Sequence, residues 1–291
     1  MPSAVIKPTA VHWRINSPCN RRCPFCYGPH KIKEASLEDS LPVLDKLVHF
    51  GIESVIITGG EPTLSKKFDA VLQYLHARDV KVVLYTNCDF WDDHDEVLSD
   101  CLHTLCIPLE GASWFVHDKQ RGEGSMRNIL KVMNRYAHGG GPFEVKVGTV
   151  VGSHNVAELP GLLYLLDKYK IKIWKLYEYI PYDDRPLQEQ WTANNQSISN
   201  AQYRAATQAI VNTVGRKTPI GLSSELDRDQ SYFMLQPNLD VIVPVKQPDG
   251  KFADELICNA TTSSMEEVQR LWMQTVDFDR YVDNLQAAAF V

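Results

Sequence analysis

Cys19-Asn20-Arg21-Arg22-Cys23-Pro24-Phe25-Cys26-Tyr27 is the segment around which this chain is organised. It places three cysteines within eight residues, spaced C-x3-C-x2-C, and an aromatic residue follows the last of them. Soft thiolate ligands on one short loop suit an iron–sulfur cluster, so Cys19, Cys23 and Cys26 are predicted to bind three irons of a 4Fe–4S cube. No fourth cysteine follows nearby, which leaves one iron free for another ligand. An open metal position is typical of catalytic rather than structural sites.

The amino-acid composition argues against nucleic-acid-binding and membrane-spanning proteins. The chain has 291 residues, 44% hydrophobic and 23% charged, which is an ordinary globular balance. Its net charge is −6, so bulk nucleic-acid binding is not expected. No apolar run approaches the ~18 residues that span a membrane, and the first residues lack the apolar segment of a signal peptide. We therefore expect a cytoplasmic protein without membrane contact, whose reducing surroundings suit free thiols.

Strand-like and helix-like segments alternate along the first 180 residues at roughly 30 residues per unit, as in repeated βα units. The predicted strands are 11–16, 54–58, 81–86, 104–108, 143–151 and 171–179. The predicted helices are 37–50, 68–77, 126–138 and 157–169, and a further helix is predicted to begin at the acidic residues 92–96. Six βα units are too few to close the usual eight-stranded barrel. The expected fold is therefore α/β, with an open, partial (β/α)6 barrel of the TIM type over residues 1–180.

The regular alternation of strand-like and helix-like segments ends after Pro181. The expected elements beyond it are polar loops at 183–200, a helix at 201–214, hairpin strands at 240–245 and 252–257, and helices at 265–273 and 278–288. The hairpin is predicted from Pro248-Asp249-Gly250, which has the residues of a tight turn. Residues 181–291 are thus expected to form an α+β extension that covers the barrel opening.

Polar residues follow the predicted strands where each one ends. The cysteine loop comes after the first strand and Gly59-Gly60-Glu61-Pro62 after the second. Asn87 and Glu110 follow the third and fourth strands. Parallel sheets and barrels place their chemistry at the carboxyl ends of their strands. These four placements therefore predict one site at one edge of the sheet.

The cysteine spacing and the Gly-Gly-Glu-Pro segment, at the ends of consecutive strands, resemble the radical S-adenosylmethionine (radical SAM) superfamily. The resemblance covers roughly the first 180 residues. It implies an enzyme with a single 4Fe–4S cluster, bound S-adenosylmethionine (SAM) and an external one-electron donor of the flavodoxin or ferredoxin type. It also implies reductive cleavage of SAM to a 5′-deoxyadenosyl radical, which abstracts hydrogen from the substrate.

The resemblance assigns SAM contacts to seven residues. In the superfamily, glycines let the backbone approach the cofactor closely, and an acidic residue pairs with the methionyl ammonium. A planar guanidinium suits the methionyl carboxylate. The residues so assigned are Gly59 and Gly60 beside the cofactor, Glu61 at the ammonium, Arg121 at the carboxylate, Asn87 and Glu110 at the ribose, and Tyr27 at the adenine edge.

Two lysines on the last two barrel strands point to the substrate. Period-two alternation places Lys146 on one face of the fifth strand, and Lys175 with Tyr177 on one face of the sixth. Lysines are rarely buried without a partner, so these three residues are candidates to face an anionic substrate in the barrel. The alternative is that the lysines form ion pairs with the nearby carboxylates of Glu144, Glu178 or Glu110.

Among radical SAM branches, the chain is most similar to the viperin-like nucleotide dehydratases. The similar segments are Arg121-Gly122-x-Gly124, the strand of Lys146, Trp174-Lys175 and residues 231–235. In that family the corresponding lysines help to hold a nucleoside triphosphate. Here Ile173 replaces an arginine, Tyr27 replaces a phenylalanine, and the glycine-rich C-terminal segment with its arginine is absent. The resemblance therefore predicts a smaller anionic substrate, nucleotide-like or sugar-phosphate-like.

Three alternatives stay open. The hairpin, Cys258-Asn259 and a closing helix resemble the C-terminal extension of peptide-modifying radical SAM enzymes, although one cysteine does not predict a second cluster. From another class, the chain could be a non-catalytic iron–sulfur or zinc-binding module, with His12 or His30 as the extra zinc ligand. Finally, Cys88 or Cys258 could donate a hydrogen atom to a substrate radical, or could simply pack in the interior.

Overall fold

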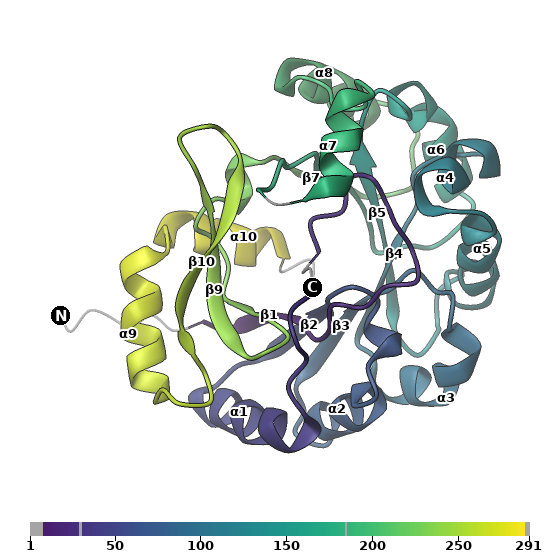
Figure 1. Ribbon diagram of the computed structural model, residues 1–291. Coiled ribbons are helices and arrows are strands. Elements are labelled where there is room, and N and C mark those ends of the chain that lie inside the picture. The colour runs from purple at the N-terminus through teal and green to yellow at the C-terminus, as the bar shows by residue number, and fades with distance from the viewer. Residues whose placement is uncertain (1–7, 29–30, 184, 289–291) are drawn as a thin grey trace.

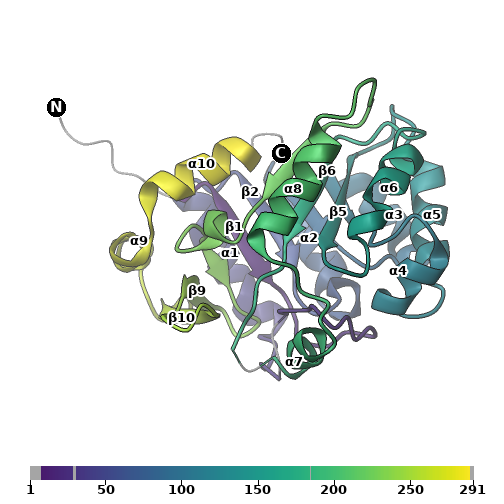
Figure 2. The same cartoon turned by 90° about the horizontal axis from the view of Figure 1, so that it is seen from above.

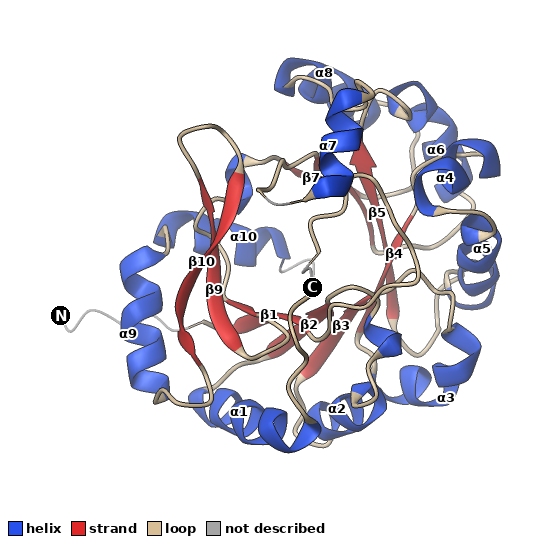
Figure 3. Cartoon of the chain, in the orientation of Figure 1, coloured by secondary structure: helices blue, strands red, loops and turns tan. Residues whose placement is uncertain are grey.

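The computed structural model describes residues 8–28, 31–183 and 185–288. Ten strands form one sheet in the order β10-β9-β8-β1-β2-β3-β4-β5-β6-β7. Figure 1 shows these strands curving around a central space, with most of the helices outside them. Figure 3 separates the outer helices from the inner strands by colour. The expected α/β fold with an open, largely parallel sheet is confirmed.

All six predicted barrel strands form, and they pair in parallel in chain order. They are β1 (Ala10–Arg14), β2 (Ser54–Thr58), β3 (Lys81–Tyr85), β4 (Thr104–Pro108), β5 (Glu144–Val151) and β6 (Ile173–Glu178). The helices between them are α1 (Leu37–Phe50), α2 (Phe68–His76), α3 (Trp91–Cys101), α4 (Trp114–Arg121), α5 (Ser125–Tyr136) and α6 (Leu159–Leu166). Of these, α4 was not predicted, and it proves to carry a residue of the site.

The strands β2, β3 and β4 are apolar on both faces over their central residues, as buried parallel strands are. On β2, Val55 and Ile57 belong to the main core, which also contains apolar residues of the surrounding helices. Ile56, between them, belongs instead to a small cluster with Val83 and Cys106 of β3 and β4. This alternation explains why these strands appear in the sequence as short continuous apolar runs.

The extension joins the same sheet at both edges. Its elements are α7 (Pro186–Ala193), α8 (Asn200–Val211), β7 (Ile220–Ser223), η3 (Leu226–Arg228), β8 (Met234–Leu235), β9 (Asp240–Lys246), β10 (Phe252–Asn259), α9 (Met265–Thr275) and α10 (Phe278–Ala288). The predicted hairpin is confirmed as antiparallel β9 and β10, and the three predicted helices form. The prediction of loops over 183–200 is wrong, because α7 lies within that segment. β7, which pairs with β6, and β8, which pairs with β1, were not predicted.

Residues 181–183 cross from the end of β6 to the hairpin. The Phe252 N–H donates to the Pro181 carbonyl at 2.8 Å, and the Asp183 N–H donates to the Phe252 carbonyl at 3.0 Å. The extension and the barrel thus share one sheet, and their apolar residues share one core. The division at residue 180 into core and covering extension stays a prediction.

Among the described residues, no helix combines the length and apolar character that crossing a membrane requires.

Candidate active site

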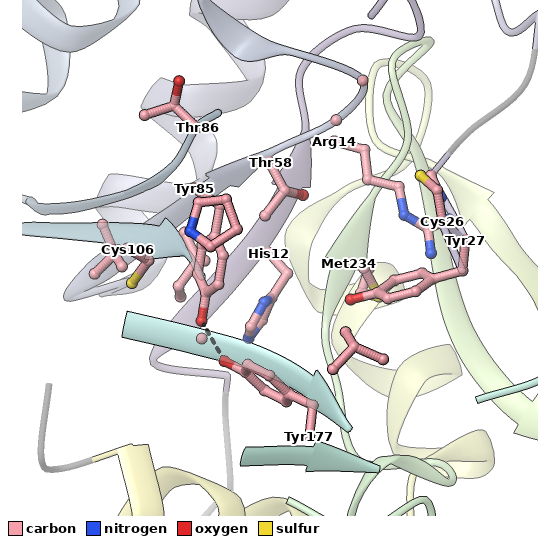
Figure 4. A pocket seen from close by; sticks show the side chains of 18 of the residues that line it. His12, Arg14, Cys26, Tyr27, Thr58, Tyr85, Thr86, Cys106, Tyr177 and Met234 are labelled. Carbon is pink, nitrogen blue, oxygen red and sulfur yellow. Dashed lines mark hydrogen bonds between the residues drawn. The ribbon is translucent and has the colours of Figure 1, made fainter. Parts of the chain in front are cut away.

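A cavity of about 1180 Å³ occupies the barrel interior, and Figure 4 shows some of the side chains that line it. Cysteine-loop residues, strand residues and residues of the extension all contribute to its wall. Twelve of the fourteen predicted site residues lie on it. They are Cys19, Cys23, Cys26, Tyr27, Gly59, Gly60, Glu61, Asn87, Arg121, Lys146, Lys175 and Tyr177. The structure therefore brings the three-cysteine loop, the glycine segment and the two lysines together in one place.

The three loop cysteines are free thiols, and each sulfur has an N–H donor beside it. The Arg21 N–H lies 3.4 Å from Cys19 Sγ, and the Gly28 N–H lies 3.3 Å from Cys26 Sγ. Cys23 Sγ accepts from the Arg121 side chain at 3.7 Å. N–H donors on cysteine sulfur are a feature of iron–sulfur sites, so this donor set fits the predicted cluster.

The zinc alternative finds no support in the part of the chain that the structure describes. No group of three Cys, His, Asp or Glu side chains there comes together in a way that would hold a single metal ion. His30, one of the two histidines considered as a zinc ligand, lies outside the described residues. His12, the other, lies on β1 and lines the cavity.

The glycine segment after β2 holds the cysteine loop in place. The Gly60 N–H donates to the Asn16 carbonyl at 3.0 Å, and the Glu61 N–H donates to the Pro18 carbonyl at 2.8 Å. A Cβ added at Gly60 would lie only 2.1 Å from the Pro18 carbonyl oxygen. Only glycine allows the two backbone segments to approach this closely.

Replacing Gly60 with alanine is expected to displace the loop and to lower the iron bound per chain, because the obstructing atom belongs to backbone that cannot rotate away. Iron content after anaerobic reconstitution measures the effect. Gly141→Ala is the control, since its nearest obstructing atom, the Tyr136 carbonyl oxygen, would be 3.2 Å away in another loop. Full iron content in Gly60→Ala would contradict the structural role.

α7 supports the cysteine loop from a second side. Trp191 is fully buried, with its ring centre 5.2 Å from that of Phe25 and 5.5 Å from that of Tyr179. The Gln188 side chain donates to the Phe25 and Ile180 carbonyls, each at 3.1 Å. Figure 2 shows α7 close to the purple segment that contains the cysteines. A proline at the first helical position, Pro186, was the sequence signal that could have revealed this helix.

Glu61 connects the ends of β2 and β3. One carboxylate oxygen accepts from the hydroxyls of Thr63 and Thr86, both at 2.7 Å, and the other accepts from the Asn87 N–H at 2.8 Å. Burial raises the pKa of Glu61, while these hydrogen bonds act in the opposite direction. Asn87 donates in turn to Asn20 of the cysteine loop at 2.8 Å. Contacts of Glu61 and Asn87 with SAM stay predictions.

Glu110 is not among the residues that line the cavity, and its predicted contact with the ribose stays a prediction. The residue is fully buried, and one carboxylate oxygen accepts from Arg121 Nε at 3.0 Å. The other oxygen accepts from the Val150 N–H at 2.9 Å. Both acceptors are therefore engaged inside the protein, and neither faces the cavity.

Cys88 is likewise not among the residues that line the cavity, and its candidacy as a hydrogen-atom donor stays a prediction. The backbone turns at this residue with φ of 64°, and the side chain, 3% exposed, belongs to the main core. Cys106 of β4 lines the cavity instead, as Figure 4 shows. The position of Cys88 after a strand did not reveal that the turn directs its side chain into the core.

The two predicted lysines have no carboxylate partner in ion-pair contact among the described residues. Each of the carboxylates considered for them bonds elsewhere: Glu144 to Lys172 at 2.7 Å, Glu178 to Asn200 at 2.7 Å, and Glu110 to Arg121. Within the described residues, no carboxylate lies within 4.0 Å of Lys146 or Lys175. The ion-pair alternative is therefore wrong.

A third cation comes from the extension. Arg228, at the end of η3, has its guanidinium carbon 4.8 Å from the ring centre of Tyr177 and 5.8 Å from that of Tyr27. It donates to the Tyr27 hydroxyl at 3.3 Å, while its Nε is buried without a hydrogen-bond partner. Burial, Arg228 and Lys146 together lower the pKa of Lys175 to about 8. No local pattern around residue 228 marked it in the sequence as a site residue.

Two tyrosines meet inside the barrel. The hydroxyls of Tyr85 and Tyr177 are 3.1 Å apart and hydrogen-bonded, although β3 and β6 are not neighbours in the sheet (Figure 4). Near them, burial and the positive charge of Lys175 lower the pKa of His12 to about 3, so its ring is neutral. The chamber thus combines neutral hydrogen-bonding groups with the cationic side chains of Lys146, Lys175 and Arg228.

The chain was compared with models of known protein families. The model of the radical SAM superfamily matches residues 15–165, which include the cysteine loop and the glycine segment.

Two relatives of known name match a part of this chain. The mycofactocin maturase MftC of Mycobacterium ulcerans is 30% identical over 168 residues, which are 56% of this chain and 45% of that protein. An S-adenosylmethionine-dependent nucleotide dehydratase of Fibrobacter sp. is 22% identical over 199 residues, 62% of this chain and 58% of that protein. This chain thus spans about half the length of the curated relatives that it matches.

The same fold occurs in a solved structure, Streptococcus suis SuiB bound to S-adenosylmethionine. The TM-score is 0.70 at 16% identity, and the match covers 95% of this chain and 67% of that one. SuiB bound to its precursor peptide SuiA matches with a TM-score of 0.69, also at 16% identity, over 94% of this chain and 66% of that one.

Proposed function

This chain belongs to the radical SAM superfamily, and from that premise we propose that it abstracts a hydrogen atom from a small anionic substrate in its barrel cavity. In this superfamily, a reduced 4Fe–4S cluster supplies the electron that cleaves SAM to the 5′-deoxyadenosyl radical. Cys19, Cys23 and Cys26 would hold the cluster, and an external one-electron donor would reduce it. The wall that contains Glu61, Asn87 and Arg121 would orient SAM.

The observation that carries the substrate class is the set of cations in the chamber. Lys146, Lys175 and Arg228 line the same cavity, and among the described residues no carboxylate lies within 4.0 Å of either lysine. A desolvated cation is costly unless an opposite charge compensates it, and an anionic group of the substrate would supply that charge. A contact between opposite charges is stronger in surroundings of low dielectric constant than in water. A phosphate or carboxylate bound here would hold the rest of the substrate in place for hydrogen abstraction.

We propose a nucleotide-like or sugar-phosphate-like substrate. The similarity to a nucleotide dehydratase supports this class. The departures at Ile173 and at the C-terminal segment favour an anion smaller than a triphosphate.

An acidic peptide is the second candidate substrate. The cavity of about 1180 Å³ exceeds the ~300–1,000 Å³ of ordinary small-ligand pockets, although SAM would take part of it. The fold neighbour SuiB has a precursor peptide bound in one of its structures. A peptide carboxylate would meet the same three cations.

The function is tested with protein reconstituted anaerobically. We expect about four iron and four sulfide per chain, and release of 5′-deoxyadenosine with dithionite and SAM. A screen of nucleotides, sugar phosphates and acidic peptides should find compounds that increase this release. Absence of 5′-deoxyadenosine from iron-loaded protein would overturn the proposed activity, and stimulation by peptides alone would replace the nucleotide class.

Anion binding is expected to weaken as pH rises past 8. The pKa of Lys175 is lowered to about 8, so its charge in the free protein is present below that pH and is lost above it. Sulfate, whose own charge is constant in this range, is a suitable probe for calorimetry. Its affinity should fall about tenfold between pH 7 and pH 9, following the loss of that one charge.

Lys175→Met should weaken sulfate binding by roughly 10–100-fold at pH 7, the usual value of a charged hydrogen bond. It should also remove most of the pH dependence. Lys172→Met is the matched control, because that lysine already pairs with Glu144 and lies outside the cavity. An equal loss of sulfate affinity in Lys175→Met and Lys172→Met would exclude a specific role of Lys175.

A further inference from the structure

Arg121 contacts one of the predicted cluster ligands directly. This last residue of α4 donates from Nη1 to Cys23 Sγ at 3.7 Å. Its guanidinium carbon lies 4.9 Å from the ring centre of Phe25, two residues further along the loop. Hydrogen bonds to ligand sulfurs and nearby positive charge both stabilise the reduced form of an iron–sulfur cluster, which carries one more electron.

Glu110 fixes the direction of that guanidinium. One carboxylate oxygen accepts from both Nε and Nη2 of Arg121, at 3.0 and 2.5 Å. The Val150 N–H on β5 holds the other oxygen at 2.9 Å. Because Glu110 is fully buried, solvent does not screen the pair, and Nη1 is left to point at the cysteine loop.

His117 holds the backbone of Glu110. Its Nδ1 accepts the Glu110 N–H at 2.9 Å, and its Nε2 lies 3.1 Å from the Ser125 hydroxyl. Burial, with smaller contributions from Arg121 and Arg21, lowers the pKa of His117 to about 3. The histidine is therefore neutral, and the charges that act on Cys23 from this side are those of the Glu110–Arg121 pair.

We propose that Arg121 and Glu110 together set the reduction potential of the cluster through Cys23. The positive charge of Arg121 makes the cluster easier to reduce, and the negative charge of Glu110 offsets part of that effect. This role rests on the proposed cluster at the three cysteines, but it is separate from the predicted contact between Arg121 and SAM. It also gives a role to a carboxylate that is fully buried beside the cluster loop.

The proposal predicts shifts of opposite sign in two isosteric variants. Arg121→Gln removes the positive charge and should move the midpoint potential to more negative values. Glu110→Gln removes the offsetting charge and should move it to less negative values. The double variant restores the charge balance and should return the midpoint close to that of the parent. Arg121→Lys keeps the charge without the planar fork, so its shift should be smaller than that of Arg121→Gln.

The measurement is a redox titration of each reconstituted protein without SAM, followed by the electron paramagnetic resonance signal of the reduced cluster. Omitting SAM separates this role from cofactor binding. Arg22→Gln is the matched control, because this exposed arginine lies on the same loop and its charge is screened by solvent. Its shift should be smaller than that of Arg121→Gln.

Two results would overturn the inference: an unchanged midpoint in Arg121→Gln, or shifts of the same sign in the two single variants. If Arg121→Gln does not bind iron, the midpoint potential of Arg121→Lys is compared with that of Glu110→Gln. The first should shift slightly to more negative values and the second to less negative values. Failure of the parent protein itself to bind iron is a different outcome, because it would overturn the proposed cluster and with it the proposed function.

Discussion

Replacing Cys23 with alanine is expected to abolish 5′-deoxyadenosine formation, down to the level of a protein-free blank. Cys23 is the buried member of the three-cysteine loop, and its sulfur faces Arg121 rather than solvent. Since the loop offers three thiolates and one cluster iron is left for SAM, loss of one ligand leaves no protein residue to replace it. Iron content, the visible absorption of the cluster and the yield of 5′-deoxyadenosine should all fall together.

Cys88→Ala is the control for this experiment. Cys88 is also buried, but it belongs to the main core and lies outside the cavity. Its replacement should leave iron content and 5′-deoxyadenosine yield near those of the parent protein. Unchanged cleavage in Cys23→Ala would refute the ligand assignment. Loss of cleavage in iron-loaded Cys88→Ala would support a chemical role for that cysteine.

Replacing Asp254 with asparagine is expected to lower the free energy of unfolding by about 3–5 kcal/mol, the usual cost of breaking a buried ion pair. Arg14 of β1 is 1% exposed, and it forms a salt bridge with Asp254 of β10. Burial alone would lower the pKa of Arg14, but Asp254 more than offsets this and raises it. Arg14 therefore stays charged in the variant and loses its partner.

Urea unfolding of the cluster-free protein measures this loss. Glu255→Gln is the matched control, because Glu255 is the next residue of β10, is exposed, and loses the same charge. Its effect should be within about 0.5 kcal/mol, as for most surface substitutions. Equal stability of the two variants would show that the Arg14–Asp254 pair does not fasten the hairpin to β1.

The sequence predicted the part of the molecule in which local pattern determines structure. The strands β2, β3 and β4 are short apolar runs because both of their faces are buried, and the glycine segment, Asn87 and Glu110 were found because they follow these runs. The cysteine loop was found from its own spacing. Lys146 and Lys175 were found because alternation along a strand determines which face a residue occupies.

The sequence did not reveal contacts that depend on distant parts of the chain. Position after a strand does not show that Glu110 bonds to Arg121 or that Cys88 packs in the main core, because the turn that follows each strand decides where the side chain points. Arg228 and Trp191 reach the site only because the extension returns to the barrel. The two residues of β8 are likewise too few to show a periodic pattern, and they form a strand because β1 offers them a partner.

The placement of β1 in the middle of the sheet has a consequence for how the protein is made. One edge of this strand pairs with β8, and the Thr9 N–H donates to the Tyr281 hydroxyl, 272 positions further along the chain. At a synthesis rate of about 5–20 residues per second, β8 is made on the order of 10–40 s after β1. The unpaired edge of β1 is an aggregation hazard through that interval. Loading of the cluster on the loop that follows β1 is thus expected after translation rather than during it.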